Sequence, residues 1–438
     1  MRISILGIGY VGAVASACLA AQGHDVTAVD VNPAKVDCIN AGQSPIVEPG
    51  LGKLIGAAVA AGRLRATSDV GTAIGTTEIS FICVGTPSLA NGDLDLTYVR
   101  RATEAIGVAL SRIKGFHLVV LRSTVLPGTT ACVVVPLLEQ ESGKRVGEHF
   151  GVAVCPEFLR EGNAIKDYTD AAVTVLGVDD KNSEMLLKDV MTGLHGDIVV
   201  TTTATAEMIK YANNAWHATK IVFSNEIGSI AKAFGLDGRS VMDIVRRDHR
   251  LNISPAYMRP GFAFGGSCLP KDLRAITYGA KRVDVPCPML ESLLVSNERH
   301  IYRVLEMVRE AGSRRVGLIG LSFKPGTDDL RESPAVELVE RLFGKGYDIR
   351  IFDNNVCVER LTGTNWSFVQ SRIPHLTSLL STDARAVAQH GDTLIIAHAD
   401  QAIRSMLTPL RDDQRVIDLG AFSAEEAPAS GCYCGICW

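Results

Sequence analysis

Three glycines near the N-terminus constrain the fold of this chain more than any other feature. A short apolar run, Ile3 to Leu6, leads into Gly7-Ile-Gly9-Tyr-Val-Gly12, and an alanine-rich stretch from Ala13 to Ala21 follows. A second apolar run, Val26 to Val29, ends at Asp30. Glycine permits the tight turn from strand to helix and lets the two pack closely. The pattern therefore predicts a strand, a helix and a second strand, which begin a doubly wound α/β sheet.

The same turn is suited to a dinucleotide. Glycine lets a pyrophosphate approach the helix N-terminus, where free N–H groups and the helix dipole favour an anion. Asp30 lies 18 residues after Gly12, where an acid accepts hydrogen bonds from a ribose, and no arginine directly follows it. These features predict NAD rather than NADP. They also argue against a signal peptide at residues 2–21, although Arg2 and the apolar run after it resemble one.

Composition indicates a soluble protein of several domains. The chain has 438 residues, 47% of them hydrophobic and 21% charged, and about 150 residues per domain predicts about three domains. A net charge of −4 gives no electrostatic case for nucleic acid or an anionic membrane as a partner. Apolar runs stay shorter than the roughly 18 residues of a membrane span. Eleven scattered cysteines, among them Cys83 and Cys155 inside apolar runs, favour the reducing cytoplasm.

The tail carries Cys432, Cys434 and Cys437. A metal site needs about four ligands at suitable spacing. We therefore expect no metal here and interpret the tail as mobile or as contacting a partner.

Polar residues follow the next predicted strands, Ile79–Val84, Leu118–Leu121 and Val152–Val154. Ligands of a doubly wound sheet collect at the carboxyl ends of its strands. Thr86 and Thr124 are thus candidates for the ribose or nicotinamide side of the cofactor, with helix capping as the alternative.

Glu157 and Glu161 follow the third of these strands. They share one face if their segment is helical, and two carboxylates beside a nicotinamide can handle protons. The alternative is an ordinary solvated helix start.

Residues 201–234 predict one long helix, because Gly228 is the only glycine or proline among them. Apolar side chains cover much of its circumference and predict burial. Lys210, Asn214 and His217 recur at spacings of four and three, and Asn225 follows two turns later. A solvated face normally holds more Glu, Lys and Arg, so this row predicts a substrate-facing surface, with a solvated face as the alternative.

A second glycine-rich segment runs from Phe262 to Arg274 with the sequence FAFGGSCLPKDLR. Gly265 and its neighbour let a ligand approach the backbone, and Pro270 fits the first turn of a helix. Cys268 is predicted at this loop-to-helix junction, where the helix dipole favours a thiolate. With Lys271 and Asp272 it offers a nucleophile, a charge stabiliser and a base; a buried structural cysteine is the alternative.

A second α/β unit is predicted near the C-terminus. Its first strand, Val316–Leu321, is followed by a loop, a helix over 334–344 and a strand that ends at Asp353. Lys324 and Arg331 in the loop suggest a second phosphate or nucleotide site, with a solvated surface loop as the alternative. The predicted fold is therefore α/β, with two Rossmann-like doubly wound domains joined by a long helix and a small helical domain. One domain would hold NAD, and the other a nucleotide that carries the group to be oxidised.

The chain resembles the UDP-glucose/GDP-mannose dehydrogenase family in a set of segments that reaches from residue 1 to about 353. They are GIGYVG, VGTPS, RSTVLPGT, PEFLREG, EMIKYANNAWHATKIVFSNE, FGGSCLPKD and GLSFKPGTDDLRESP. The segments YMRPGFAFGGSCLPKDLRA and DHRLNIS are most similar to the branch that oxidises GDP-mannose to GDP-mannuronate for alginate. Ala256 departs from that branch, which often has an aromatic residue before Tyr257. Oxidation of UDP-glucose or a UDP-N-acetylhexosamine is the alternative within the family. Outside it, the alternatives are an NAD-bound scaffold protein and a two-electron hydroxyacid dehydrogenase.

The resemblance implies a four-electron oxidation with two NAD per turnover, through a thiohemiacetal and a thioester on Cys268. Lys210 and Asn214 would hold the oxygen of the intermediates, and Asp272 with Thr124 and Glu157 would activate water. The implied substrate contacts are Glu161, Lys210, Asn214, His217, Asn225, Tyr257, Arg259, Phe262, Gly265 and Lys324. The implied NAD contacts are Gly7, Gly9, Tyr10, Val11, Gly12, Asp30, Lys35, Thr86, Thr124, Lys271 and Arg331.

The resemblance also implies a domain-swapped homodimer, or a dimer of dimers, that shares the long helix, with Arg259 entering the partner's site. The expected domains are residues 1–200 for NAD, residues 201–300 for the long helix and dimerisation, and residues 301–438 for the sugar nucleotide.

Overall fold

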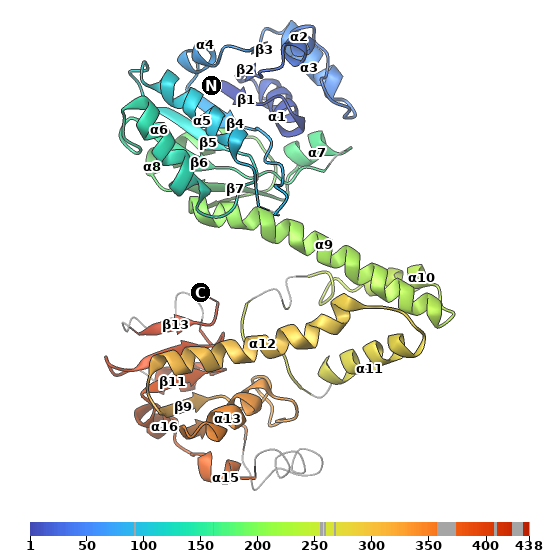
Figure 1. Ribbon diagram of the computed structural model, residues 1–438, viewed down its shortest axis with the longest axis vertical. Helices are drawn as coiled ribbons and strands as arrows, with labels where there is room; N and C mark the ends of the chain where they lie inside the picture. Colours follow the sequence, from blue (N-terminus) through green and yellow to red (C-terminus); the bar gives the residue numbers. More distant parts are fainter. Residues whose placement is uncertain are drawn as a thin grey trace. The chain divides into compact units, whose positions relative to one another are not determined.

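The computed structural model describes residues 1–91, 93–160, 162–254, 257, 260–266, 269–356, 374–406, 410–422 and 432–437. The chain divides into two compact units, Met1–Ala218 and Thr219–Trp438 (Figure 1). The division into three domains at residues 200 and 300 stays a prediction.

The first unit is built on an eight-stranded sheet with the order β3-β2-β1-β4-β5-β6-β7-β8. All neighbouring strands are parallel except β6 and β7. The first six positions follow the order of a Rossmann fold, which confirms the predicted doubly wound domain. The strands are β1 Arg2–Leu6, β2 Asp25–Val29, β3 Leu64–Thr67, β4 Ile79–Ile82, β5 His117–Leu121, β6 Phe150–Val154, β7 Val173–Val178 and β8 Asp197–Thr201.

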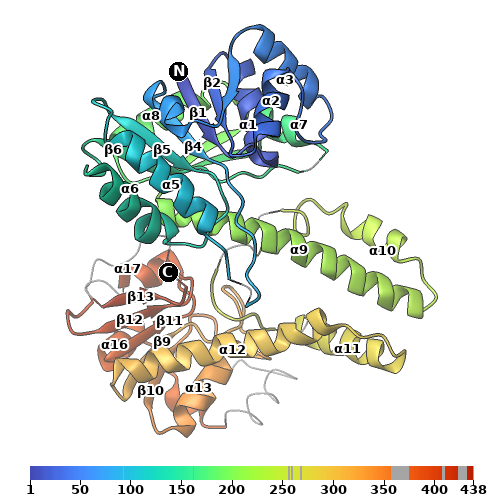
Figure 2. The same ribbon diagram turned by 45° about the horizontal axis from the view of Figure 1, so that its top comes forward.

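Helices cover both faces of this sheet (Figure 2). Successive side chains of a strand point to opposite faces, so Leu118 and Val120 join one apolar core while Val119 and Leu121 join the other. Burial on both faces explains why the strands are almost continuously apolar. The first face is covered by α1 Tyr10–Ala21, α2 Pro33–Asn40, α3 Leu51–Ala60, α7 Ala164–Thr169 and α8 Lys181–Met191, the second by α4 Val70–Gly75, α5 Thr97–Leu110, the π-helical turn η1 Thr130–Val134 and α6 Val135–Ser142.

The long helix α9 spans Thr203–Ala233 and confirms the predicted single helix. The predicted burial is wrong for the middle of this helix in the isolated chain. Residues 214–222 are exposed, and Ile221 keeps 61% of its surface. Apolar side chains of this middle stretch, such as Trp216 and Ile221, therefore stay partly exposed among the described residues.

The second unit holds a five-stranded parallel sheet with the order β10-β9-β11-β12-β13. This confirms the second α/β unit. Its strands are β9 Arg315–Ile319, β10 Asp348–Phe352, β11 Thr393–Ile396, β12 Arg415–Asp418 and β13 Tyr433–Gly435. Its helices are α10 Gly238–Val245, α11 Leu269–Arg282, α12 Pro288–Ala311, α13 Pro334–Gly344, α15 Leu376–Leu379, α16 Ala384–His390 and α17 Gln401–Met406. Apolar residues of α12 and α13 fill the core on one face of the sheet, and residues of α16 and α17 fill the core on the other.

The described part of the tail corrects one prediction. It forms the edge strand β13, which pairs with β12, instead of a mobile extension. Cys434 donates to the carbonyl of Val416 at 3.5 Å, while Cys432 and Cys437 are exposed. Across the described ranges, no helix has both the length and the apolarity needed to cross a bilayer.

Candidate active site

The turn between β1 and α1 shows why its glycines are needed. Gly7 has a φ of +98°, and a Cβ on it would lie 2.9 Å from the carbonyl oxygen of Cys83. A Cβ on Gly12 would lie 1.9 Å from the carbonyl oxygen of Gly7. Gly9 precedes the helix without a side chain to cap it, which leaves the first N–H groups of α1 open to an anion.

A cavity of about 400 Å³ lies beside this turn. Its lining brings together four predicted residues, Gly7, Gly9, Asp30 and Lys35. Asp30 accepts hydrogen bonds from the N–H groups of Ile8 at 2.7 Å and Asn32 at 2.9 Å, and Lys35 lies 3.6 Å away. The carboxylate thus shapes the turn and faces the cavity, where it suits a ribose diol and repels a 2′-phosphate. The donor set and the cavity fit NAD.

Tyr10 and Val11 begin α1, and the Tyr10 hydroxyl forms hydrogen bonds with residues outside this helix. It donates to Glu48 at 2.5 Å and to the carbonyl of Arg160 at 3.4 Å. Glu48 is 8% exposed and also accepts from the N–H groups of Gly162 and Ala164. These hydrogen bonds, led by that of Tyr10, lower the pKa of the Glu48 carboxyl. Glu48 was not predicted from the sequence, because its partners lie far from it along the chain.

The ends of β4 and β5 are joined by the two predicted threonines. The Thr86 hydroxyl donates to the carbonyl of Thr124 at 2.8 Å. The residues at the helix N-cap positions that follow are Leu96 for α5 and Thr129 for η1. The capping alternative for Thr86 and Thr124 is therefore wrong.

Two buried thiols lie beside these strand ends. Cys83 and Cys155 are 8% and 1% exposed, as predicted. Burial raises the pKa of Cys83 to about 12 and also raises that of Cys155. Thiols with raised pKa values are weak nucleophiles at neutral pH, so both have a structural role.

Lys210 and Glu157 form a buried ion pair. Their Nζ and Oε1 atoms are 2.9 Å apart, and the two side chains are 9% and 13% exposed. The other Glu157 oxygen accepts from the N–H of Leu159 at 2.7 Å, and the Lys210 ammonium lies over the Phe158 ring. Such a pair holds a cation and a proton acceptor in fixed positions.

The condition for a shared helical face of Glu157 and Glu161 is not met over residues 155–160. Residues 155–160 form an irregular segment, and α7 begins only at Ala164. Arg160 binds Asp167 through its backbone N–H and two guanidinium N–H groups, which holds this segment in its irregular path. Glu161 lies outside the described residues.

Like Glu48, Glu207 is a buried carboxylate whose role was not predicted from the sequence. It is 2% exposed and accepts from the N–H of Gly128 at 2.6 Å and from the N–H and hydroxyl of Thr130 at 2.8 and 2.6 Å. It joins the loop after Thr124 to α9, three residues before Lys210. The sequence feature that points to Glu207 is its place as a lone acid in the first turns of an apolar helix.

The remaining polar row on α9 is exposed. Asn214, His217 and Asn225 all lie at the surface of the isolated chain. Helix geometry places Asn214 and His217 on the face of Lys210. Among the described residues, Lys210 is the member of this row that contacts another predicted residue, Glu157.

In the second unit, Pro270 lies in the first turn of α11, as predicted. Lys271 and Asp272 pair at 3.0 Å on its exposed surface. Tyr257 has a φ of 62° and is 88% exposed, whereas Phe262 packs against the apolar core. Cys268, Arg259 and Ala256 lie outside the described residues.

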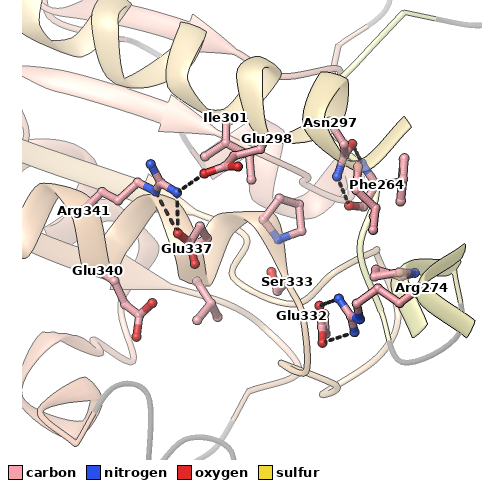
Figure 3. A pocket seen from close by; sticks show the side chains of 14 residues that line it. Phe264, Arg274, Asn297, Glu298, Ile301, Glu332, Ser333, Glu337, Glu340 and Arg341 are labelled. Atoms are coloured by element: carbon pink, nitrogen blue, oxygen red, sulfur yellow. Dashed lines mark hydrogen bonds and ion pairs between the residues drawn. The ribbon is translucent and has the colours of Figure 1, made fainter. Parts of the chain in front are cut away.

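The segment before α11 passes along a pocket of about 280 Å³ (Figure 3). Asn297 binds both backbone groups of Phe264, accepting at 2.9 Å and donating at 2.8 Å. A Cβ on Gly265 would lie 2.3 Å from the carbonyl oxygen of Glu332. Arg274 binds the Glu332 carboxylate at 2.7 and 3.2 Å. Residues that flank the predicted nucleophile segment are therefore fixed to α12 and to the loop after β9.

The loop after β9 is held in the same way as the β1–α1 turn, by an aspartate that accepts hydrogen bonds from backbone N–H groups. Asp353, at the end of β10, accepts from the N–H groups of Leu321 at 2.7 Å and Ser322 at 2.9 Å. Asp353 also lines a cavity of about 190 Å³. In the same loop Lys324 is exposed above the Phe323 ring, and Arg331 binds Asp329 at 2.7 Å. This is the geometry of a second nucleotide-type domain.

Models of one protein family match most of the chain. The NAD binding domain of the UDP-glucose/GDP-mannose dehydrogenase family matches residues 1–195, the central domain 204–299 and the UDP binding domain 317–422. The chain belongs to the UDP-glucose/GDP-mannose dehydrogenase family. Members of this family are NAD-dependent sugar-nucleotide dehydrogenases, and this chain is one of them.

Individual members show how far this similarity extends. A GDP-mannose 6-dehydrogenase of Pseudomonas syringae pv. tomato is 52% identical, and one of Pseudomonas aeruginosa is 51% identical, each over all of both chains. A UDP-glucose 6-dehydrogenase of Haloferax volcanii is 40% identical over 81% of this chain and 83% of its own. The solved ternary complex of GDP-mannose dehydrogenase from P. aeruginosa covers both chains fully, with a TM-score of 0.96 and 50% identity.

Family membership confirms NAD as the cofactor, as predicted from Gly7, Gly12 and Asp30. The cavity that fits NAD lies at the carboxyl ends of β1, β2 and β4. Among the described residues, no group of His, Cys, Asp and Glu is arranged to hold a metal ion.

Proposed function

We propose that this dehydrogenase oxidises GDP-mannose to GDP-mannuronate, a precursor of alginate, and reduces two NAD per molecule of acid. The observation that carries the substrate assignment is similarity over the full length. The GDP-mannose 6-dehydrogenases are 50–52% identical to this chain over all 438 residues. The UDP-glucose 6-dehydrogenases of H. volcanii and Bacillus subtilis are 40% and 36% identical over about four fifths of it.

The chemistry depends on Cys268. NAD, when bound, accepts the hydride that the sugar loses in each of the two oxidations. The Cys268 thiolate adds to the aldehyde left by the first oxidation and holds the sugar as a thiohemiacetal. Loss of a proton and the second hydride converts this adduct to a thioester, which water cleaves to the carboxylate and the free thiolate. The aldehyde is never released.

The buried ion pair in the first unit supports this scheme. We assign the Lys210 ammonium to the oxyanion that develops at the reacting carbon, with Asn214 as a second donor. Glu157, with Thr124 and Asp272, positions and deprotonates the water that cleaves the thioester. The Thr86–Thr124 hydrogen bond and the buried carboxylates of Glu48 and Glu207 hold the segments that carry Thr124, Glu157 and Lys210. Little reorganisation of these three groups is therefore needed during the reaction.

The binding residues follow the family pattern. The proposed substrate contacts are Glu161, Lys210, Asn214, His217, Asn225, Tyr257, Arg259, Phe262, Gly265 and Lys324. The proposed NAD contacts beyond the glycine turn are Tyr10, Val11, Asp30, Lys35, Thr86, Thr124, Lys271 and Arg331. We also propose the domain division at residues 200 and 300.

The exposed apolar surface of α9 supports a homodimer. Trp216, Ile221 and Val222 are each at least 40% exposed in the isolated chain, and Phe234 and Leu236 continue the surface beyond the helix. Apolar patches of this kind mark contacts between proteins. We propose that two chains pair along α9 and exchange Arg259 between their sites, with a dimer of dimers as the larger assembly.

We propose the cytoplasm as the location. All nine cysteines of the described residues are free, and Cys83 and Cys155 are deeply buried. Free thiols in this number suit a reducing compartment.

A substrate panel tests this function. The purified enzyme is mixed with NAD and limiting GDP-mannose, UDP-glucose or a UDP-N-acetylhexosamine, and NADH and acid are counted separately. We expect two NADH per acid with GDP-mannose. An exclusive response to a UDP-sugar would refute the substrate assignment. One NADH per product would indicate a two-electron dehydrogenase, and no NADH with any sugar nucleotide would indicate a scaffold protein.

A further inference from the structure

Glu48 joins two parts of the first unit that lie far apart in the sequence. Its carboxylate is 8% exposed and accepts three hydrogen bonds, from the Tyr10 hydroxyl at 2.5 Å, the Gly162 N–H at 2.8 Å and the Ala164 N–H at 2.9 Å. Tyr10 is the first residue of α1, directly after the glycines of the cofactor turn. Gly162 and Ala164 lie where the irregular segment after β6 enters α7.

The segment that Glu48 holds also carries part of the reaction site. Residues 155–160 lead from β6 to Gly162 and include Glu157, which pairs with Lys210 at 2.9 Å. Arg160 ties the same segment to Asp167 of α7 at 2.7 and 2.9 Å. The segment is therefore held at Glu157, Arg160 and Gly162, and we expect a shift at Gly162 to move Glu157.

The other end of the connection lies at the helix N-terminus where the cofactor is expected to bind. The pyrophosphate of a dinucleotide binds at the N-terminus of the helix that follows the glycine turn. Tyr10 is located there, and its hydroxyl also contacts the carbonyl of Arg160 at 3.4 Å. Binding of a dinucleotide thus acts on a residue that is hydrogen-bonded to the Glu157 segment through Glu48.

We propose that Glu48 is a positioning residue that couples dinucleotide binding at the β1–α1 turn to the geometry of the Glu157–Lys210 pair. The coupling is reciprocal: if the dinucleotide changes the affinity for the sugar nucleotide by some factor, the sugar nucleotide changes the affinity for the dinucleotide by the same factor. This inference rests on the proposed function for the sugar nucleotide and for the assignment of Glu157 and Lys210 to the reaction site.

Glutamine at position 48 tests the hydrogen bonds of Glu48 without changing the size of its side chain. A Glu48→Gln side chain keeps the shape, but its amide nitrogen is a donor where the carboxylate accepted. It would face the Tyr10 hydroxyl or a backbone N–H and lose at least one of the three bonds. Tyr10→Phe removes one bond without disturbing the backbone contacts. Glu306→Gln makes the same chemical change on an exposed residue of α12 and is the matched control.

The test measures the dissociation constant of NADH by its fluorescence, with and without saturating GDP-mannose. NADH is already reduced, so it cannot oxidise GDP-mannose during the measurement. The coupling factor is the ratio of the two constants. We expect a factor of roughly 5 or more in either direction for the wild type and Glu306→Gln, within the usual range for coupled sites. For Glu48→Gln and Tyr10→Phe we expect a factor near 1, even where NADH alone still binds.

The proposal is overturned if the wild-type factor is 1, or if a folded Glu48→Gln enzyme keeps the wild-type factor. If Glu48→Gln does not fold, Tyr10→Phe is used instead, and a wild-type coupling factor in this variant overturns the proposal. If GDP-mannose fails to bind while a UDP-sugar is oxidised, the substrate assignment fails, and the same ratio is measured with that sugar nucleotide.

Discussion

At the scale of single residues, Lys210 is the most informative position. Its ammonium pairs with Glu157 in a buried setting, and its removal leaves Glu157 without that partner. We expect Lys210→Met to lower kcat about 100-fold or more, as the loss of an oxyanion donor does. We also expect a stability loss of about 3 kcal/mol, because half of a buried ion pair remains. Steady-state kinetics and urea unfolding measure the two effects.

The double variant Lys210→Met/Glu157→Gln separates these effects. It removes both charges, so most of the stability should return while kcat stays low. Recovery of activity together with stability would show that the pair is structural. Lys114→Met, at an exposed position before β5, is the control.

His117 predicts a pH dependence of stability. Burial lowers its pKa to about 4, and its Nε2 lies 2.7 Å from the Ser80 hydroxyl. The unfolded chain, with a histidine pKa of about 6.5, binds this proton more readily, so stability falls as the pH falls from about 6.5 toward about 4.

The size of this effect is measurable against a variant. Between about pH 7.5 and about pH 5 we expect His117 to account for a loss of about 2 kcal/mol. His117→Gln should remove that part of the pH dependence in urea unfolding. An unchanged slope in the variant would contradict a neutral, buried His117.

At the scale of elements, the link between α12 and the segment before α11 carries a prediction. Asn297 satisfies both backbone groups of Phe264 (Figure 3). Asn297→Ala leaves these groups without their partner, which costs about 1–3 kcal/mol. We expect faster amide hydrogen exchange at residues 261–266 and a lower kcat. Ser296→Ala, one position earlier on an exposed side of α12, should change neither, and equal exchange in both variants would argue against the link.

Strands and helices with a regular pattern were predictable from the sequence. The run Ile3–Leu6 and the glycines after it predicted β1 and α1, and Pro334 to Gly344 predicted α13, because burial and helix-start signals are local. The irregular path of residues 155–160 was not predictable, since Arg160 depends on Asp167 and the end of the segment depends on Glu48. Glu48 and Glu207 were missed for the same reason: their roles come from backbone groups that only the fold brings to them.

At the scale of the whole molecule, the exposed apolar residues of α9 carry a prediction. Its apolar residues suggested burial, yet Trp216 and Ile221 are exposed in the isolated chain. A partner chain is the covering surface that we propose. We expect a native mass of about twice 46.8 kDa or a multiple of it, and Ile221→Glu should shift the mass toward the monomer by placing a charge in a desolvated contact. Light scattering after size exclusion measures this, and a wild-type monomer would refute the dimer.

The central claim concerns Cys268 as the covalent nucleophile. The most direct measurement stops a reaction of enzyme, NAD and GDP-mannose with acid during turnover and determines the mass of the peptide that contains Cys268. The account predicts a sugar-nucleotide acyl adduct on this peptide, its absence in Cys268→Ser, and loss of acid formation in that variant. Full acid formation by Cys268→Ser, with no adduct on the wild-type peptide, would contradict it.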